Sequence, residues 1–200
     1  YLNELNNRGP DYTEIKKIRY DNKIINVGFK RLAIQDLSEE SNKIFCTKDY
    51  MLLFNGEIYN KKYLKQKYLS NIKLETSSDT EVLFNLLIHI GNKIILEIQG
   101  IFSIVFINLK KGNIELIRDF TGTKPLYYSL SENRVLFSSE AWFLYSLSKK
   151  KINKNSFDFY LNFGFTPNEN TLIENVKKVK PRNKLAIDLN NFKINEEIYF

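Results

Sequence analysis

The sequence predicts an α+β fold in which antiparallel β-sheets are covered by helices. Apolar residues alternate with polar ones over short stretches in both halves of the chain, as in half-buried strands. Residues 111–113, 121–125 and 131–133 are turn-forming segments between such stretches. Helical periodicity is confined to a few blocks. This segregation of strands from helices favours antiparallel sheets over a doubly wound parallel sheet.

The expected strands follow from this alternation. In the first of them, Ile25, Val27 and Phe29 alternate with polar residues and glycine. The second and third flank Lys48 and Asp49, as in a hairpin. Strands are expected at residues 24–34, 43–47, 50–54, 102–109, 114–118, 126–129, 135–138, 184–189 and 192–200.

The clearest helix is expected to begin at Ser78. Ser78 and Glu81 match a capping box, and Gly91 is placed to end the helix. Its apolar stripe has helical spacing and consists of Leu83, Leu86, Leu87 and Ile90. A shorter helix should follow Asn60, and two more are expected at residues 140–147 and 156–162.

The composition indicates one folded core. The 200 residues are 43% hydrophobic, which is enough for a single domain with a trailing segment. No apolar run approaches 18 residues and no leader pattern is visible, so we expect no membrane partner and a cytoplasmic location. A single cysteine, Cys46, excludes an internal disulfide framework.

The net charge of +7 raises the question of nucleic-acid binding. The lysine pairs lie in different expected loops and helix faces and do not form one basic stripe interleaved with aromatic residues. Lys, Asn and Ile are frequent throughout the chain, which indicates a compositional drift. We therefore expect no nucleic-acid partner.

Residues 54–60, Phe-Asn-Gly-Glu-Ile-Tyr-Asn, form the most informative run. Asn55 and Gly56 offer two hydrogen-bond donors for an oxyanion, and Glu57 offers an acceptor for an ammonium group, in what we expect to be a tight turn. The alternative is an ordinary hairpin turn, because Asn and Gly both tolerate positive φ.

Four other segments hold polar residues that packing does not require. They are residues 8–11 (Arg-Gly-Pro-Asp), Arg31 at a strand end, Asp79 in the first helical turn, and residues 118–128, which begin Arg-Asp. Each has a structural alternative: Asp79 can interact with the helix dipole, Arg31 can be solvated, and Arg118 and Asp119 can form a local ion pair.

Together these segments resemble one family. Residues 8–11, 31–34, 55–60, 78–79, 99–102, 118–128 and 138–140 occur in the order and approximate spacing of the glutamine amidotransferase domain of glutamine-hydrolysing asparagine synthetases. The resemblance covers essentially the whole chain. It implies the N-terminal nucleophile hydrolase fold, a four-layer αββα sandwich of two antiparallel sheets, here without its first strand.

The resemblance also implies roles for individual residues. Asn55 and Gly56 would form the oxyanion hole for glutamine hydrolysis. Arg31 would bind the α-carboxylate of glutamine, and Glu57 and Asp79 would accept hydrogen bonds from its α-ammonium group. The remaining expected pocket residues are Leu32, Ala33, Ile34 and Gln35, and the expected supporting residues are Arg8, Asp11, Arg118 and Asp119.

The chain departs from the family pattern at both ends. The nucleophile of the family is an N-terminal cysteine whose own α-amino group acts as base, whereas this sequence starts Tyr1-Leu2-Asn3. We expect residues 1–165 to form the amidotransferase domain without its N-terminus, and residues 166–200 to end it and lead towards an absent ATP-dependent synthetase domain. ATP and Mg²⁺ would belong to that absent domain. The expectation for this domain is no cofactor and no metal, with glutamine and the synthetase domain as partners and homodimerisation as an option.

Cys46 is expected to be buried, inert packing because its neighbours in the strand are apolar. His89 is expected to have a surface or packing role, and Trp142 a core or interface role. Two functional hypotheses follow. The chain is the glutaminase half of an ATP-dependent asparagine synthetase, with aspartate as the default acceptor, or it is a catalytically silent scaffold of a related amide-forming enzyme. The complete set of pocket residues favours the first hypothesis.

Overall fold

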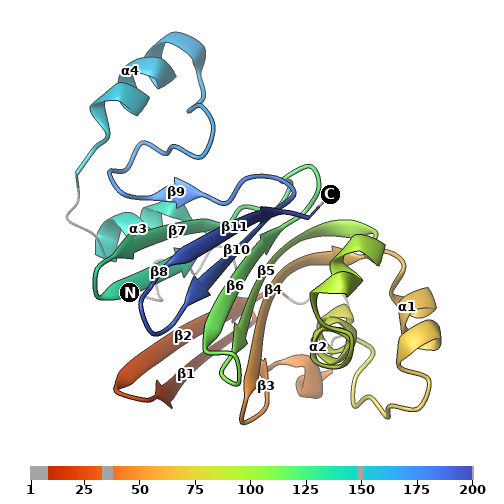
Figure 1. The fold of residues 1–200 in the computed structure, drawn as a ribbon. Coiled ribbons are helices and arrows are strands. Elements are labelled where there is room, and N and C mark those ends of the chain that lie inside the picture. Colours follow the sequence, from red (N-terminus) through yellow and green to blue (C-terminus); the bar gives the residue numbers. More distant parts are fainter. Residues whose placement is uncertain (1–8, 33–37, 148–150, 200) are drawn as a thin grey trace.

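The computed structural model describes residues 9–32, 38–147 and 151–199. A six-stranded antiparallel sheet with the order β11-β10-β6-β5-β4-β3 forms its centre (Figure 1). Its strands are β3 (Phe45–Cys46), β4 (Tyr50–Ile58), β5 (Gly100–Asn108), β6 (Asn113–Arg118), β10 (Asn183–Asp188) and β11 (Ile194–Ile198). Residues 183–198 thus belong to the same sheet as the strand that carries Asn55.

Two smaller antiparallel sheets form the second β-layer. One pairs β1 (Tyr12–Tyr20) with β2 (Lys23–Arg31), and the other has the order β8-β7-β9. Its strands are β7 (Tyr127–Ser131), β8 (Arg134–Ser138) and β9 (Lys177–Lys178). The predicted second sheet is therefore divided into two among the described residues.

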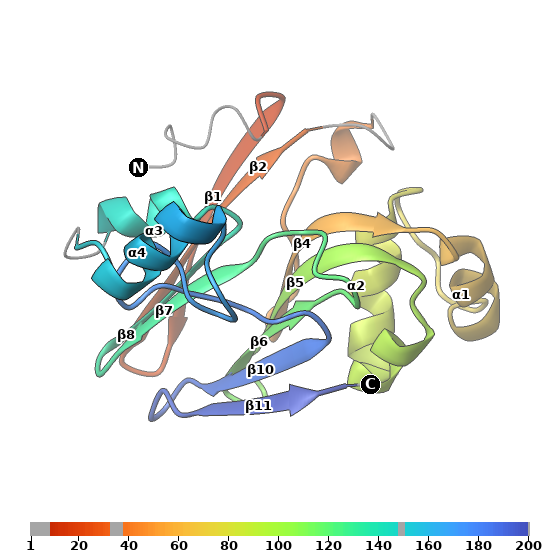
Figure 2. The same ribbon diagram turned by 90° about the horizontal axis from the view of Figure 1, so that it is seen from above.

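Helices lie on the outside of both β-layers. α1 (Lys61–Tyr68) and α2 (Asp79–His89) cover one face of the six-stranded sheet, followed by the 3₁₀-helix η3 (Gly91–Glu97) (Figures 1 and 2). α3 (Ala141–Leu147) packs on the β7–β8 sheet, and α4 (Lys154–Phe163) stands further out. A second 3₁₀-helix, η2 (Glu39–Ser41), precedes β3. This layer order confirms the predicted α+β fold.

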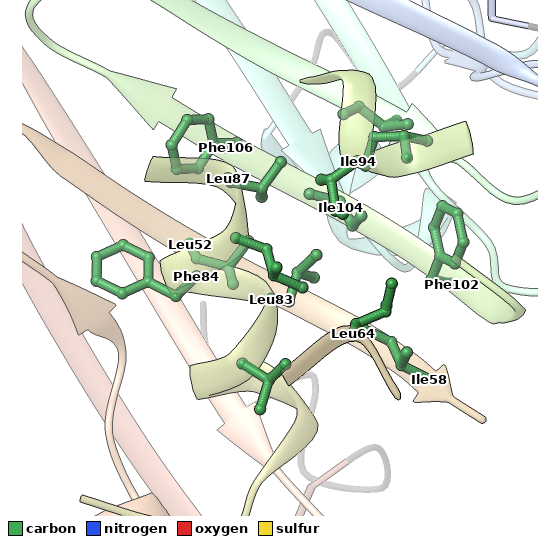
Figure 3. Packing of buried hydrophobic residues seen from close by; sticks show 14 of the residues in the cluster. Leu52, Ile58, Leu64, Leu83, Phe84, Leu87, Ile94, Phe102, Ile104 and Phe106 are labelled. Carbon is green, nitrogen blue, oxygen red and sulfur yellow. The ribbon is translucent and has the colours of Figure 1, made fainter. Parts of the chain in front are cut away.

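The alternation of β5 explains why the central sheet is buried on both faces. Phe102, Ile104 and Phe106 point towards α2 and η3, where they pack in a cluster with Leu83 and Leu87 (Figure 3). The intervening residues Val105 and Ile107 pack in a second cluster, between the two β-layers, with residues of β2 and β10. A strand buried on both faces reads as an almost continuous apolar run, as residues 101–107 do.

The predicted start and end of α2 are both confirmed. The Ser78 side chain caps the helix by accepting a hydrogen bond from the Glu81 N–H at 3.2 Å. Gly91 ends the helix in the left-handed region, with φ of 76°.

Replacing Gly91 with alanine should test this end of the helix. A Cβ at Gly91 would meet nothing within 4 Å, so only backbone strain opposes the substitution. We expect Gly91→Ala to lower the free energy of unfolding by about 1 kcal/mol, and Gly91→Asn by less, because Asn tolerates this conformation. Urea denaturation measures both, and equal losses in the two variants would contradict the backbone explanation.

The sequence analysis missed β1. Its inward-facing side carries Glu14 and Lys16 next to Ile18 and Tyr20, and Ile15 lies on the exposed side, so the strand has no clean alternation of apolar and polar residues. The Glu14 and Lys16 side chains bind the backbone of Ile44: its N–H donates to Glu14 Oε2 at 2.5 Å, and its carbonyl accepts from Lys16 Nζ at 3.2 Å. Because charged side chains contact the neighbouring segment here, this face of β1 lacks the apolar periodicity by which a strand is predicted from sequence.

One prediction about burial was wrong. Cys46 is exposed at the edge of the central sheet, where its Sγ lies 3.0 Å from Lys16 Nζ. Trp142 is 65% exposed and stacks on Tyr145 on the surface of α3, so it lies outside the core, and its interface role stays a prediction. His89 is exposed at the end of α2, which fits a surface role. None of the helices in the described parts of the chain is long and apolar enough to cross a membrane.

Candidate functional site

Asn55, Gly56 and Glu57 lie inside strand β4. They pair with Ser103, Phe102 and Ile101 of β5, and none of the three has positive φ. Both the hairpin alternative and the predicted tight turn were therefore wrong. Because side chains alternate along a strand, Asn55 and Glu57 share the face that carries Met51 and Leu53, which is directed towards the second β-layer.

The hydrogen-bond pattern of β4 shows where the Gly56 N–H points. In an antiparallel ladder, pairs that exchange backbone hydrogen bonds alternate with pairs that do not. Tyr59 donates to the Gln99 carbonyl at 2.8 Å, so the Gly56–Phe102 pair, three steps away, is of the second kind. The Gly56 N–H is therefore directed away from β5, to the edge of β4 beyond the end of the short strand β3.

Gly56 is also required by close packing. A Cβ at this position would lie 2.3 Å from the Ile101 carbonyl oxygen and 2.7 Å from Phe102 Cα. The mainchains of β4 and β5 thus approach too closely for a side chain at Gly56. Gly100 is in the same situation, since its Cβ would lie 2.2 Å from the Glu57 carbonyl oxygen.

Asp79 closes the same edge of β4. It is the first residue of α2, it is 8% exposed, and its Oδ2 accepts a hydrogen bond from the Ile58 N–H at 3.2 Å. Ile58 and Gly56 have the same parity in the ladder, so both N–H groups point to this edge, about 6.7 Å apart along the strand. Burial raises the pKa of the Asp79 carboxyl, although the Ile58 hydrogen bond and the charge of Lys61 oppose that rise.

Arg31 approaches from the second β-layer. It shares its face of β2 with Ile25 and Val27, which pack against the central sheet. Its guanidinium donates to Asn42 Oδ1, a partner that the sequence analysis did not identify. Gly9 and Asp11 flank Arg31: a Cβ at Gly9 would lie 2.6 Å from the Arg31 nitrogen, and the Asp11 N–H donates to the Arg31 carbonyl at 3.1 Å.

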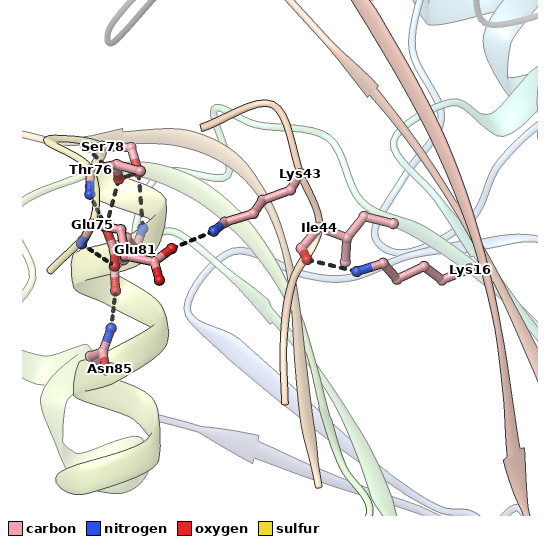
Figure 4. A network of polar contacts seen from close by, with 8 residues as sticks. All are labelled: Lys16, Lys43, Ile44, Glu75, Thr76, Ser78, Glu81 and Asn85. Carbon is pink, nitrogen blue, oxygen red and sulfur yellow. Dashed lines mark hydrogen bonds and ion pairs between the residues drawn. The ribbon is translucent and has the colours of Figure 1, made fainter. Parts of the chain in front are cut away.

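A polar network joins the segment after Asn42 to the start of α2 (Figure 4). Lys43 forms an ion pair with Glu75 at 2.7 Å. The buried Glu81 carboxylate accepts from the N–H groups of Glu75 and Thr76 at 2.9 and 2.6 Å, so it holds this loop against the helix that carries Asp79. Asn42 and Asp79 thus lie on connected segments.

Arg118 and Asp119 hold the loop from β6 to β7 rather than facing each other as a simple ion pair. The Asp119 carboxylate accepts from the N–H groups of Thr121, Thr123 and Lys124 at 3.0 to 3.1 Å. The Arg118 guanidinium donates to the carbonyls of Gly122, Lys124 and Val179. Burial of Asp119 opposes its ionisation, but these hydrogen bonds outweigh it and hold the pKa of the carboxyl below its usual value.

A family model described as a glutamine amidotransferase domain matches residues 1–200. The chain belongs to this family. Among curated proteins, it is 33% identical to the "Putative asparagine synthetase [glutamine-hydrolyzing] 2" of Methanocaldococcus jannaschii, over 100% of the chain and 43% of that protein. It is 31% identical to "Asparagine synthetase [glutamine-hydrolyzing] 1" of Bacillus subtilis, over 90% of the chain and 28% of that protein. The amidotransferase chain thus spans less than half the length of these relatives.

Solved structures agree on the fold. The glutamine phosphoribosylpyrophosphate amidotransferase of B. subtilis superimposes with a TM-score of 0.62 at 17% identity, covering 100% of this chain and 45% of that one. A glutamine aminotransferase class-II domain protein from Silicibacter pomeroyi gives a TM-score of 0.53 at 13% identity, covering 94% and 91% of the two chains. The predicted N-terminal nucleophile hydrolase fold and the amidotransferase family are both confirmed.

The remaining site predictions fall in three groups. The Gly56 N–H and Asp79 lie at one edge of β4, and Asn55 and Glu57 lie on its face towards the second β-layer, to which Arg31 on β2 belongs, while the roles of all five stay predictions. Leu32 follows β2 and is exposed. Arg8, Ala33, Ile34 and Gln35 lie outside the described residues. Within the described ranges, no group of His, Cys, Asp and Glu side chains is arranged to hold a metal ion.

The raised pKa of Asp79 gives a testable pH dependence. Between the ordinary carboxyl value and the raised folded value, the native domain binds more protons than the unfolded chain, so its stability falls as pH rises through this window. Asp79→Asn removes this titration while its Oδ1 can still accept from Ile58. We expect the variant's free energy of unfolding to exceed that of the parent by a margin that grows across the window.

Urea denaturation at a series of pH values measures this margin. Asp158→Asn, which removes an exposed carboxyl on α4, is the matched control for the loss of one surface charge. Parallel stability curves for the parent and Asp79→Asn would contradict the explanation by burial.

Proposed function

We propose that this domain hydrolyses glutamine to glutamate and ammonia, and that the ammonia amidates a carboxylate in the remaining part of a longer polypeptide. The observation that supports this most directly is the edge of β4. There the N–H of Gly56 points to the same edge as the Ile58 N–H that Asp79 accepts, and Asn55 and Glu57 lie on the face towards the second β-layer, which carries Arg31 on β2. Within the described ranges, the Asn55 side-chain amide forms no hydrogen bond with another side chain or with the backbone.

Each end of glutamine then has chemically suitable partners. Arg31 can bind the α-carboxylate through its guanidinium, while Asp79 and Glu57 accept hydrogen bonds from the α-ammonium group. When a thiolate adds to the side-chain amide carbon, the carbonyl oxygen becomes an oxyanion that Asn55 Nδ2 and Gly56 N–H stabilise. As this intermediate collapses, the base that took the thiol proton returns it to the departing nitrogen, so ammonia leaves and a thioester remains. Water then hydrolyses the thioester to glutamate and the free thiol.

We assign the thiolate to an N-terminal cysteine of the complete polypeptide, as in the family pattern. Cys46 is unsuitable because it pairs with Met51, five residues along β4 from Gly56. That separation corresponds to about 17 Å. A nucleophile must lie within contact distance of the amide carbon, so Cys46 is too far from the proposed oxyanion hole.

We propose the synthetase region of that polypeptide as the partner of this domain, with aspartate as the acceptor and the cytoplasm as the location. The length of the relatives supports this, because the chain covers 43% of the M. jannaschii protein. The surface of α4 supports it too. The exposed large apolar side chains on and after this helix are Phe157, Tyr160, Leu161, Phe163 and Phe165, a group that a covering domain would shield from water.

The complete reading frame and a glutaminase assay test the proposal. We expect the frame to begin Met-Cys and the purified full-length polypeptide to release glutamate from glutamine. Another residue after the initiator methionine, together with synthesis that proceeds from free ammonia alone, would instead establish the silent-scaffold hypothesis. Aspartate, ATP and ammonia supplied together measure the synthetase reaction independently of glutamine.

A further inference from the structure

Phe102 connects the proposed oxyanion hole to the loop after β6. It is the β5 partner of Gly56, and that pair exchanges no backbone hydrogen bond. Both backbone groups of Phe102 instead engage Asp119: the Asp119 N–H donates to the Phe102 carbonyl at 2.9 Å, and the Phe102 N–H donates to Asp119 Oδ2 at 3.2 Å. These two hydrogen bonds to Asp119 therefore help to fix the position of Phe102 against Gly56.

Asp119 is itself held rigidly. It is completely buried, and its carboxylate accepts from Phe102 as well as from the three loop N–H groups described above. Its backbone carbonyl accepts from Gly122 and Arg182 at 3.1 Å. A carboxylate that satisfies this many donors fixes its neighbours in one arrangement, since any shift leaves a buried donor unpaired.

We propose that Asp119 is a positioning residue for glutamine hydrolysis, acting through Phe102 on the direction of the Gly56 N–H. This rests on the proposed function of Gly56 as an oxyanion donor. A Cβ on Gly56 would lie only 2.7 Å from Phe102 Cα, so the two backbones are packed closely together here and a displacement of Phe102 is transmitted to the Gly56 backbone. An oxyanion hole stabilises the transition state through hydrogen-bond donors that are already in position. A displaced Gly56 N–H should therefore reduce transition-state stabilisation more than it reduces the affinity for glutamine.

Asp119→Asn in the full-length polypeptide tests the proposal, with Glu115→Gln as the matched control. Glu115 is also a buried carboxylate and lies on β6, but it binds Asn92 and its β5 partner is Phe106, four residues from Phe102. We expect Asp119→Asn to lower kcat by roughly tenfold at an almost unchanged KM. Loss of a whole oxyanion donor costs about 10²–10³ in rate, and a displaced donor should cost less. Glu115→Gln should leave kcat unchanged.

An aldehyde analogue of glutamine separates positioning from general destabilisation. Addition of the thiol to its aldehyde carbon places an oxygen in the oxyanion position, whereas glutamate binding does not. We expect Asp119→Asn to weaken the aldehyde by the same factor as kcat and to leave glutamate affinity unchanged. Equal weakening of both ligands, or an unchanged kcat, would overturn the proposal.

A nuclear magnetic resonance measurement tests the same link without activity. Asn55-Gly56 is the one Asn-Gly pair in the 200 residues, so carbonyl-¹³C asparagine and ¹⁵N glycine labelling of the full chain identifies the Gly56 amide. We expect its resonance to shift in Asp119→Asn and not in Glu115→Gln.

If Asp119→Asn does not fold, Thr121→Val, which removes one hydrogen bond to Asp119 Oδ1, should give a smaller shift. An unmoved resonance overturns the inference, whereas a shift with an inactive parent overturns only the proposed function.

Discussion

Gly56→Ala is expected to abolish most glutamine hydrolysis and to destabilise the domain at the same time. The added Cβ would lie 2.3 Å from the Ile101 carbonyl oxygen, which is backbone of a central strand and cannot move aside as a side chain can. Overpacking of this kind costs about 1–3 kcal/mol or more in the free energy of unfolding. Strand β4 must separate from β5 to relieve the contact, which also displaces the Gly56 N–H. We therefore expect kcat to fall by roughly 10²-fold or more.

Urea denaturation and a glutaminase assay on the full-length polypeptide measure the two effects. Gly91→Ala is the matched control, because it adds the same methyl group at a glycine with no atoms within 4 Å of the new Cβ and lies outside the site. It should reduce stability slightly and leave kcat unaltered. A Gly56→Ala enzyme with parental kcat would show that this N–H takes no part in the reaction.

The sequence predicted most elements whose apolar residues face one core. Helix α2 shows this well, because the Ser78 cap, the Leu83 and Leu87 stripe and the Gly91 end are all local signals. Strand β1 could not be predicted in this way. Its inner face presents Glu14 and Lys16 to the backbone of Ile44, thirty residues later in the chain. Hydrogen bonds between distant segments leave no periodic signal in a single sequence.

The candidate site was predicted by residue but not by geometry. Asn55 and Gly56 were expected in a turn because the pair tolerates positive φ, but the strand continues to Ile58. The reason for glycine here is the close approach of Phe102, forty-six residues further on, which no local pattern reveals. Asn42 was missed for a similar reason. A lone asparagine after a short polar segment gives no sign that its side chain will bind Arg31.

Asn55→Ala is expected to remove the second oxyanion donor without the packing damage of Gly56→Ala. The side chain is half-buried, its backbone pairs with Ser103 in the regular ladder, and alanine is compatible with a strand position. We expect kcat for glutamine hydrolysis to fall by about 10²–10³, which corresponds to about 2.7–4 kcal/mol of transition-state stabilisation. KM should change little, because the ground-state amide oxygen needs these donors less than the oxyanion does.

A comparison of the activity lost with glutamine and with ammonia as the nitrogen source identifies the role of Asn55. With ammonia in place of glutamine, synthesis by the full-length Asn55→Ala polypeptide should match the parent, since the amide acts only in releasing ammonia. Equal loss with both nitrogen sources would mean that Asn55 supports the fold or the contact with the synthetase region. Asn55→Asp sharpens the distinction: it preserves size but places a carboxylate beside the developing oxyanion, and like charges repel. A transition-state role therefore requires Asn55→Asp to be at least as impaired as Asn55→Ala, whereas a packing role requires the reverse order.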